Sequence, residues 1–310
     1  MNRQILFRLM LLCAVTLAIA GCAAPTPTPL PPTATIAPTR VPPTATTAPT
    51  VPPTTAPTLA PPTATLAPTA TSAPPSATPV KEITATLTWL GHPSFILKTS
   101  TGLTALLDPI AAVVGYPVIP VTGVDVVTVS HEHSDHNNVA LATGSPTILR
   151  GLAGNDWAKI DQTIKGVRVR TVPTFHDDTQ GTQRGKNAIF VFEFDGMRIA
   201  HLGDLGHKLS DDQIKAIGNV DAVMIPVGGF YTIDGKNAAQ VVAQLNPKVV
   251  IPMHYKTPAL TASLSAVLAT QDDFIAALGN SAKVVPTGQT ITLASTKLPN
   301  ERTVMVMSYK

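Results

Sequence analysis

The segment VDVVTVSHEHSDH, residues 124–136, determines the expected fold and chemistry of this 310-residue chain. Its first six residues form an apolar run with the length and composition of a buried strand. The residues that follow place His131, His133, Asp135 and His136 within six positions. Imidazole and carboxylate groups bind zinc, or manganese or iron where oxygen ligands count for more. These side chains cannot all point one way, so the segment can supply two metal ions lying side by side at a strand end.

Four single residues elsewhere in the chain also follow strand-like runs: His92, His176, Asp204 and His254. In layered α/β proteins, ligands bind at the edge where buried strands end. We therefore expect these four side chains to gather at one edge of the domain, where they would complete or line two metal sites.

The wider pattern predicts an α/β domain with a β-rich first half. Alternating or apolar runs predict strands over 84–90, 94–98, 103–107, 124–129, 167–172 and 188–194. Asp195-Gly196 is a hairpin signal before a further strand over 197–202. Helical patterns over 211–217, 238–245 and 272–278 then alternate with extended runs over 222–227, 249–252, 284–285, 290–293 and 303–308. Such an order predicts stacked sheets with helices outside.

The order His-x-His-x-Asp-His, a single His, Gly-Asp and a final His resembles the metallo-β-lactamase fold superfamily. Four flanking motifs are more specific: WLGHPSF (89–95), LLDP (106–109), IPVGG (225–229) and IPMHY (251–255). They resemble a narrower group that contains the ascorbate-6-phosphate lactonase-like proteins and related metal-dependent hydrolases. The resemblance extends from about residue 87 to residue 255. It implies an αββα sandwich.

The resemblance also implies two divalent metal ions, zinc before manganese or iron, and assigns their ligands. The first ion is assigned His131, His133 and His176, the second Asp135, His136 and His254, with Asp204 bridging both. Two ions about 3.5–4 Å apart lower the pKa of a shared water toward neutrality. The expected reaction is therefore attack by metal-bound hydroxide on an ester, lactone or phosphodiester of a small-molecule substrate.

Further residues are expected to assist this reaction. Asp135 and His92 are the expected catalytic residues: Asp135 orients the nucleophile or relays a proton, and His92 or Tyr255 stabilises the oxyanion. Asp108, His201 and Tyr255 are expected to orient the ligand imidazoles. The alternative hypothesis is a lipid-anchored protein that binds a metal or ligand without turnover. The complete ligand set favours the hydrolase.

The first 21 residues predict a lipoprotein signal peptide. Two arginines precede an apolar run over 9–20, and Ile19-Ala20-Gly21-Cys22 resembles a bacterial lipobox in which Cys22 is lipidated. A plain secretory signal or an N-terminal anchor helix is the alternative. The lipoprotein interpretation places the protein outside the cytoplasm of a bacterium, anchored to the cell membrane through its N-terminal lipid.

Composition separates a spacer, residues 22–80, from a metallo-hydrolase domain, residues 81–310. Residues 24–80 contain 18 Pro, 17 Thr and 12 Ala, too few large apolar groups to offset the entropy of ordering, so we expect disorder. All 19 acidic and 19 of the 22 basic residues lie in the domain, which is near neutral and lacks the basic block typical of nucleic-acid binding. Cys13 and Cys22 are the only cysteines, so the domain has no disulfide and no thiolate metal site.

Overall fold

The computed structural model describes residues 82–310. The expected signal peptide (1–21), the lipidation of Cys22 and the expected spacer (22–80) lie outside the described residues. Among the helices of residues 82–310, none is both long enough and apolar enough to cross a membrane.

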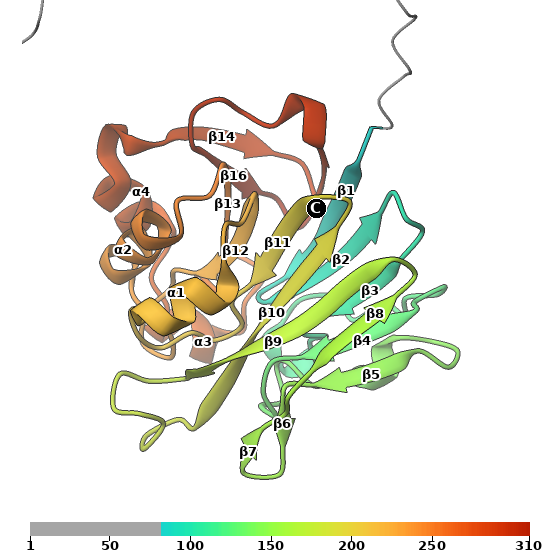
Figure 1. Ribbon diagram of the computed structural model, residues 1–310. Helices are drawn as coiled ribbons and strands as arrows, with labels where there is room; N and C mark the ends of the chain where they lie inside the picture. Colours follow the sequence, from blue (N-terminus) through green and yellow to red (C-terminus); the bar gives the residue numbers. More distant parts are fainter. Residues whose placement is uncertain (1–81) are drawn as a thin grey trace, which may run out of the picture. The chain divides into compact units, whose positions relative to one another are not determined.

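Two sheets and a short hairpin contain the strands (Figure 1). The six-stranded sheet has the order β15-β1-β2-β3-β4-β5, with β1 (Thr84–Gly91), β2 (Ser94–Thr99), β3 (Thr104–Leu107), β4 (Val126–Val129), β5 (Thr147–Arg150) and β15 (Thr290–Ala294). The eight-stranded sheet has the order β14-β16-β13-β12-β11-β10-β9-β8, with β8 (Asp161–Ile164), β9 (Val167–Phe175), β10 (Lys186–Phe194), β11 (Met197–His201), β12 (Ala222–Pro226), β13 (Val249–Met253), β14 (Lys283–Thr287) and β16 (Thr303–Met307). The hairpin consists of β6 (Leu152–Ala153) and β7 (Asp156–Trp157).

The α-helices are α1 (Asp211–Ile217), α2 (Gly235–Leu245), α3 (Ala262–Val267) and α4 (Asp272–Leu278). Short 3₁₀ helices are η1 (Ala112–Val114), η2 (Val139–Leu141), η3 (Gly279–Ser281) and η4 (Ser295–Lys297). Figure 1 shows α1, α2 and α4 on one side of the eight-stranded sheet and the six-stranded sheet on the other. The layered α/β fold expected from the sequence is confirmed.

Local sequence explains where these elements form and end. Helix α1 begins with a capping box, in which the Ser210 hydroxyl accepts from the Gln213 backbone N–H and the Gln213 side chain accepts from the Ser210 N–H. Asp234 caps α2 by accepting from the Asn237 N–H. Strands β12 and β13 are buried at every residue, as parallel strands covered on both faces are.

One continuous apolar core lies between the two sheets and extends under the helices. Alternate residues of β1 point into it, namely Ala85, Leu87 and Trp89. A smaller cluster covers the outer face of the six-stranded sheet, where Val127 and Val129 pack against residues of the loop before β4 and of η2. In the described part of the chain, the cover on this face is therefore a loop with a 3₁₀ turn rather than an α-helix.

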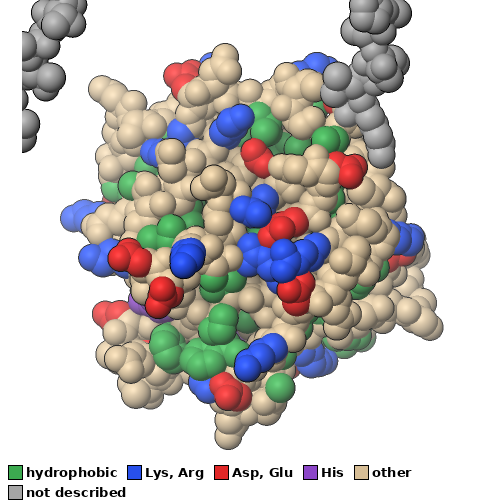
Figure 2. All heavy atoms as spheres, in the orientation of Figure 1, with side chains coloured by type: hydrophobic (Ala, Val, Ile, Leu, Met, Phe, Trp, Pro, Cys, Tyr) green, Lys and Arg blue, Asp and Glu red, His purple; other side chains and the backbone are tan. Residues whose placement is uncertain are grey.

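The surface shown in Figure 2 has basic and acidic side chains interspersed. Several basic side chains of the described residues form ion pairs: Arg168 pairs with Asp161 at 2.7 Å, and Arg170 pairs with Glu193 at 2.6 Å.

Candidate metal centre

The strand ends bring the expected site residues together. His131 lies two residues after β4, His176 directly after β9 and His254 directly after β13, while Asp204 lies three residues after β11. Strands β9, β11 and β13 run in the same direction, because β10 is antiparallel to both β9 and β11 and β11, β12 and β13 are parallel, so their carboxyl ends meet at one edge of the sheet. The structure therefore gathers residues that are far apart in the sequence, as the strand-end pattern predicts.

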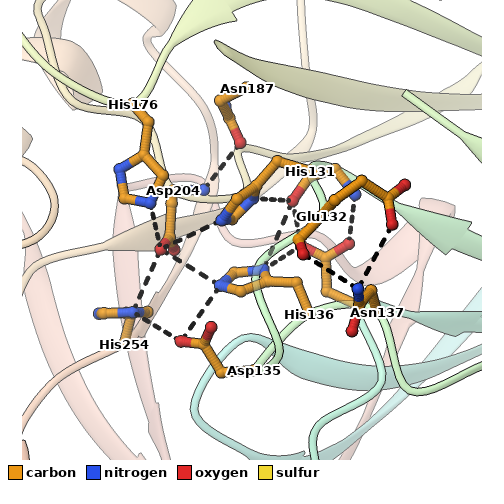
Figure 3. Close-up of polar contacts among 12 residues, drawn as sticks. His131, Glu132, Asp135, His136, Asn137, His176, Asn187, Asp204 and His254 are labelled. Atoms are coloured by element: carbon orange, nitrogen blue, oxygen red, sulfur yellow. Dashed lines mark hydrogen bonds and ion pairs between the residues drawn. The ribbon is translucent and has the colours of Figure 1, made fainter. Parts of the chain in front are cut away.

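Asp204 lies at the centre of the site (Figure 3). Its Oδ2 atom is 3.1 Å from His176 Nε2, 3.2 Å from His136 Nε2, 3.4 Å from His254 Nε2 and 3.9 Å from His131 Nε2. One carboxylate oxygen therefore faces four imidazole nitrogens supplied by three segments of the chain, the loop after β4 and the ends of β9 and β13.

The ligand-type atoms form two groups. His131, His133 and His176 form the first group, and Asp135, His136, Asp204 and His254 form the second. Within each group, the candidate atoms lie within 4.8 Å of one another. This grouping has the same membership as the two ligand sets implied by the sequence resemblance, and Asp204 also contacts the imidazoles of the first group.

The hydrogen bonding of these side chains fits a metal cation. Three buried atoms of the candidate ligands form no hydrogen bond with any described residue: His131 Nε2, His136 Nε2 and Asp204 Oδ1. Buried polar atoms are normally satisfied, because an unpaired one costs about 1–3 kcal/mol. A divalent cation bound to imidazole and carboxylate ligands would satisfy all three.

The charge states of the candidate ligands also suit a metal cation. Burial, with a further contribution from His136, lowers the pKa of His131 well below its usual value, so His131 presents a neutral imidazole. Burial disfavours the charged form of Asp204, but the imidazoles of His136, His254 and His176 outweigh it and hold the pKa of Asp204 well below its usual range. Neutral imidazole and ionised carboxylate are the forms that bind metal.

His136 differs from the other imidazoles because carboxylates face it from both sides. Burial alone would lower its pKa, but Asp204, Asp135 and Asp108 outweigh burial and raise the pKa of His136 well above its usual value. Its Nδ1 lies 2.7 Å from Asp108 Oδ2, while Nε2 faces Asp204 at 3.2 Å and Asp135 at 3.7 Å. Asp204 and Asp135 thus place negative charge where a cation on Nε2 would lie.

Asp108 and Ser130 form a buried support beneath the ligands. The Ser130 backbone N–H donates to Asp108 Oδ1 at 2.7 Å, and the Ser130 hydroxyl donates to Asp108 Oδ2 at 2.5 Å. The same hydroxyl lies 3.0 Å from His131 Nδ1. Asp108 thereby fixes the ring of His136 and, through Ser130, the ring of His131. The sequence analysis does not predict a role for Ser130. Its position between a buried strand and the His-x-His motif is the sequence feature that could have indicated one.

His92 lies behind Asp135 rather than in the open cleft. Its side chain is fully buried, its Nε2 is 3.3 Å from Asp135 Oδ2, and its ring lies on that of His254 with centroids 3.7 Å apart. Burial, with a smaller contribution from His254, lowers the pKa of His92 to about 4. This geometry lets a neutral His92 orient Asp135.

The other two residues expected to orient imidazoles occupy different surroundings. His201 Nε2 lies 2.8 Å from the Pro93 carbonyl, and the Gly203 N–H donates to its Nδ1 at 3.3 Å, so His201 holds the backbone before Asp204. Tyr255 is buried against Trp89, with ring centroids 5.6 Å apart. Its hydroxyl makes no hydrogen bond to a ligand imidazole within residues 82–310. Tyr255 therefore acts on His254 by packing the segment that contains it.

Three residues of the site have backbone conformations that L-residues rarely adopt. His92, Asp108 and His254 have φ values of 53°, 40° and 52°. Such conformations cost on the order of 1–3 kcal/mol each and persist where the surrounding structure imposes them. The backbone strain at these three residues is thus located at the metal centre and its immediate support.

Asn187 positions the bridging carboxylate and was missed from the sequence. Its side-chain oxygen accepts from the Asp204 N–H at 3.0 Å, and its amide donates to the Leu202 carbonyl at 3.0 Å (Figure 3). Gly203 has φ +54°, and a Cβ there would lie 2.4 Å from the Asn187 side-chain oxygen. Glycine is therefore required at 203 for Asn187 to reach the backbone of Asp204.

Asp177, directly after His176, organises the loop that borders the site. Its Oδ1 accepts from the Thr179 and Gly181 N–H groups at 2.9 and 2.8 Å, and its Oδ2 accepts from those of Gln183 and Arg184 at 3.0 and 2.7 Å. Burial would raise the pKa of this carboxyl, but the N–H groups of Arg184, Gly181 and Thr179 and the Thr179 hydroxyl outweigh it and hold the pKa well below the usual range.

Replacing Asp177 by alanine should loosen this loop. Four backbone donors lose a charged acceptor, and hydrogen bonds to charged groups contribute about 1.5–3 kcal/mol each, part of which water recovers once the loop opens. We expect Asp177→Ala to lower the free energy of unfolding by about 2 kcal/mol and to speed tryptic cleavage after Arg184. Urea unfolding and timed proteolysis measure the two effects. The exposed neighbour provides the control, since Asp178→Ala should change neither; equal effects would refute this role for Asp177.

A cleft of about 580 Å³ opens over the site. Its floor includes His133, Asp135, His176 and Asp204. Its upper lining is mixed, because apolar residues of η1 and α3 and the Tyr231 ring lie near polar Gln183 and Arg184: Val113, Val114, Leu264, Tyr231, Gln183 and Arg184. The volume is that of a small-molecule pocket.

Comparison with known proteins identifies the class to which this site belongs. The family described as "Beta-lactamase superfamily domain" matches residues 86–254. A protein named "UPF0173 metal-dependent hydrolase" from Archaeoglobus fulgidus is 31% identical over 196 residues, which cover 55% of this chain and 83% of that relative. A relative of the same name from Methanoregula boonei is 36% identical over 193 residues, covering 55% and 82%. A Thermotoga maritima structure, assigned to the zinc-dependent hydrolases of the metallo-beta-lactamase superfamily, has 38% identity and a TM-score of 0.56, and the match covers 72% of this chain and 98% of that one.

These matches show that the chain belongs to the beta-lactamase superfamily, within which it is a metal-dependent hydrolase of the metallo-β-lactamase fold. Its curated relatives are the UPF0173 metal-dependent hydrolases. The resemblance noted in the sequence and the enzyme class expected from it are both confirmed.

Proposed function

We propose that this hydrolase uses two divalent metal ions, zinc in the first instance, to hydrolyse an ester, lactone or phosphodiester bond of a small molecule. One observation supports this proposal most strongly: a single buried oxygen, Asp204 Oδ2, lies within 3.9 Å of imidazole nitrogens from both ligand groups. A carboxylate in that position can bridge two cations.

The proposed ligands fall into two sets that match the two groups of neighbouring ligand atoms. His131, His133 and His176 would hold one cation, Asp135, His136 and His254 would hold the other, and Asp204 would lie between them. Two such cations activate water at neutral pH and polarise the bond to be broken. The protein side chains would hold the two ions and leave the cleft above them open to a substrate.

Asp135 is the ligand best placed to handle a proton. It lines the cleft, and its side chain is 24% exposed whereas that of Asp204 is 2% exposed. His92 holds Asp135 from behind at 3.3 Å and is itself fully buried. We therefore assign Asp135 to orienting the attacking water and accepting its proton, and His92 to positioning Asp135.

We also propose that the enzyme works outside the cytoplasm of a bacterium, anchored to the cell membrane through a lipid on Cys22. The sequence of residues 1–22 supports this proposal, since a charged start and an apolar run end in a lipobox-like motif. The Pro/Thr/Ala-rich residues 22–80 would then separate domain 81–310 from the membrane, and substrates would be small molecules met on that side of the membrane.

The metal content and activity of the full chain test the catalytic proposal. We expect about two metal ions per wild-type chain, and hydrolysis of at least one member of a lactone, ester and phosphodiester panel that a chelator abolishes. His131→Ala and Asp135→Ala should each retain about one ion and lose turnover, because each removes a ligand from only one site. Elemental analysis and the substrate panel provide the measurements.

The outcomes separate the hydrolase from a binding protein. Two bound ions with no turnover on any substrate of the panel would favour the lipid-anchored binding protein. A wild-type chain without metal in every preparation would refute the ligand assignment. Lys208→Ala, an exposed substitution outside the cleft lining, should match wild type in both measurements.

A further inference from the structure

Arg184 differs from the other arginines of the described chain in its contacts. Arg150, Arg168, Arg170 and Arg198 each pair with a carboxylate, and Arg302 donates to the Asn246 side chain. Within residues 82–310, the contacts of the Arg184 guanidinium are instead with two aromatic rings, those of Phe230 at 5.9 Å and Tyr231 at 5.8 Å.

The surroundings hold Arg184 in a fixed place relative to the metal centre. Its backbone N–H donates to Asp177 Oδ2 at 2.7 Å, and Asp177 is the buried neighbour of His176. His176 in turn lies 3.1 Å from Asp204. A short chain of contacts thus connects the Arg184 backbone to the bridging carboxylate, and the side chain lines the same cleft.

The aromatic partners of Arg184 are held at some cost. Phe230 has φ +55° and the residue is 58% exposed, although a bulky residue avoids that backbone region and an apolar ring avoids water. Its ring meets that of Tyr231 edge to face, with centroids 4.7 Å apart. Strain of this kind is characteristic of functional sites. Here it places two rings where they can orient a guanidinium.

The charge of the cleft favours an anion. Two divalent cations held as proposed would outweigh the charges of Asp135 and Asp204 and leave an excess of positive charge, to which Arg184 would add. Glu132, the other acidic residue of the lining, is neutralised by Arg150 at 2.6 Å and also accepts from Asn137 at 3.3 Å. Glu132 is therefore already occupied and does not compete with a ligand in the cleft for the guanidinium.

We propose that Arg184, oriented by Phe230 and Tyr231, is the specificity-determining residue of this hydrolase and binds a carboxylate or phosphate group that the substrate carries in addition to its scissile bond. This inference rests on the proposed function and names the class of its substrate. A planar guanidinium binds such oxyanions through two parallel hydrogen bonds. The exposed Val113 and the neighbouring Leu264 would contact an apolar part of the same molecule.

Matched probes of different charge test the proposal on the metal-loaded full chain. Calorimetry compares binding of N-phenylsuccinamate with that of its neutral amide, N-phenylbutanediamide. Kinetics compares 4-nitrophenyl hydrogen succinate with its methyl ester, and 4-nitrophenyl 3-phosphonopropanoate distinguishes a phosphate-type group from a carboxylate. We expect Arg184→Gln to raise Kd and KM for the anionic probes roughly tenfold or more, the size of one lost charge-assisted pair. The neutral probes should change less than twofold, and Arg184→Lys should restore part of the loss.

Two controls make the result specific. Arg168→Gln removes the same charge outside the cleft and should match wild type, and Arg184→Gln should keep the wild-type metal content. Equal losses for anionic and neutral probes, or a wild-type chain that does not prefer the anion, would overturn the inference. Arg184-dependent binding of the anion without hydrolysis of any ester would support the inference and count instead against the proposed reaction.

Discussion

Asp204→Asn should remove both metal ions from the protein and nearly all of its activity. The substitution keeps the shape of the side chain but removes the negative charge that faces four imidazole nitrogens at 3.1–3.9 Å. Because both proposed sites share this oxygen, we expect metal content to fall well below one ion per chain. The loss of kcat/KM should exceed the roughly 10- to 100-fold loss that follows removal of a hydrogen-bond partner of a ligand.

The matched variant for this prediction is Asp135→Asn. Asp135 belongs to one ligand group only, so this variant should keep about one ion, whereas Asp204→Asn should keep almost none. Elemental analysis after gel filtration measures the difference, and circular dichroism checks that both variants are folded. Equal metal contents in the two variants would show that Asp204 serves a single site and does not bridge.

The ligand set is the part of the site that the sequence predicts most fully. Its residues follow apolar or alternating runs that predict strands, so local pattern places these side chains at or shortly after strand ends. The strand runs themselves are predicted for the same reason: β12 and β13 are buried at every position, and their apolar side chains are visible in the sequence.

Two of the elements that the sequence analysis does not predict, α3 and β8, have little or no buried face. Helix α3 has no buried residue, and three of the four residues of β8 are exposed. Neither has an apolar period to recognise, so tertiary neighbours rather than local pattern determine their conformation. Helix α3, for which the sequence analysis predicts no element, contributes Leu264 to the lining of the cleft.

The supporting residues were missed because their roles depend on contacts across the fold. Ser130 acts through Asp108, which lies 22 positions away, and Asn187 acts on the backbone of Asp204, 17 positions away. Serine and asparagine are common in loops, so residue type alone carries no signal. Arg184 is likewise recognisable only once its lack of a carboxylate partner in the described structure is known.

Asp108→Ala should show how far the metal centre depends on this support. Asp108 is fully buried and accepts three hydrogen bonds, from the Ser130 N–H, the Ser130 hydroxyl and His136 Nδ1. Removing one partner of a buried charged pair costs about 3–5 kcal/mol, because the remaining donors stay buried without an acceptor. We expect a loss of unfolding free energy in that range, measured by urea denaturation of the metal-free chain.

Asp108→Asn separates stability from metal binding. The amide can still accept from the Ser130 N–H and fills the same volume, so most of the stability should remain. It cannot accept from both the hydroxyl and His136 as a carboxylate does, and the ring of His136 loses its charged partner. Metal affinity should therefore fall roughly 10- to 100-fold, as measured by competition with a chelator. If Asp108→Asn bound metal as tightly as wild type, Asp108 would be a structural residue only, and the orientation of His136 would have to come from the packing around its ring.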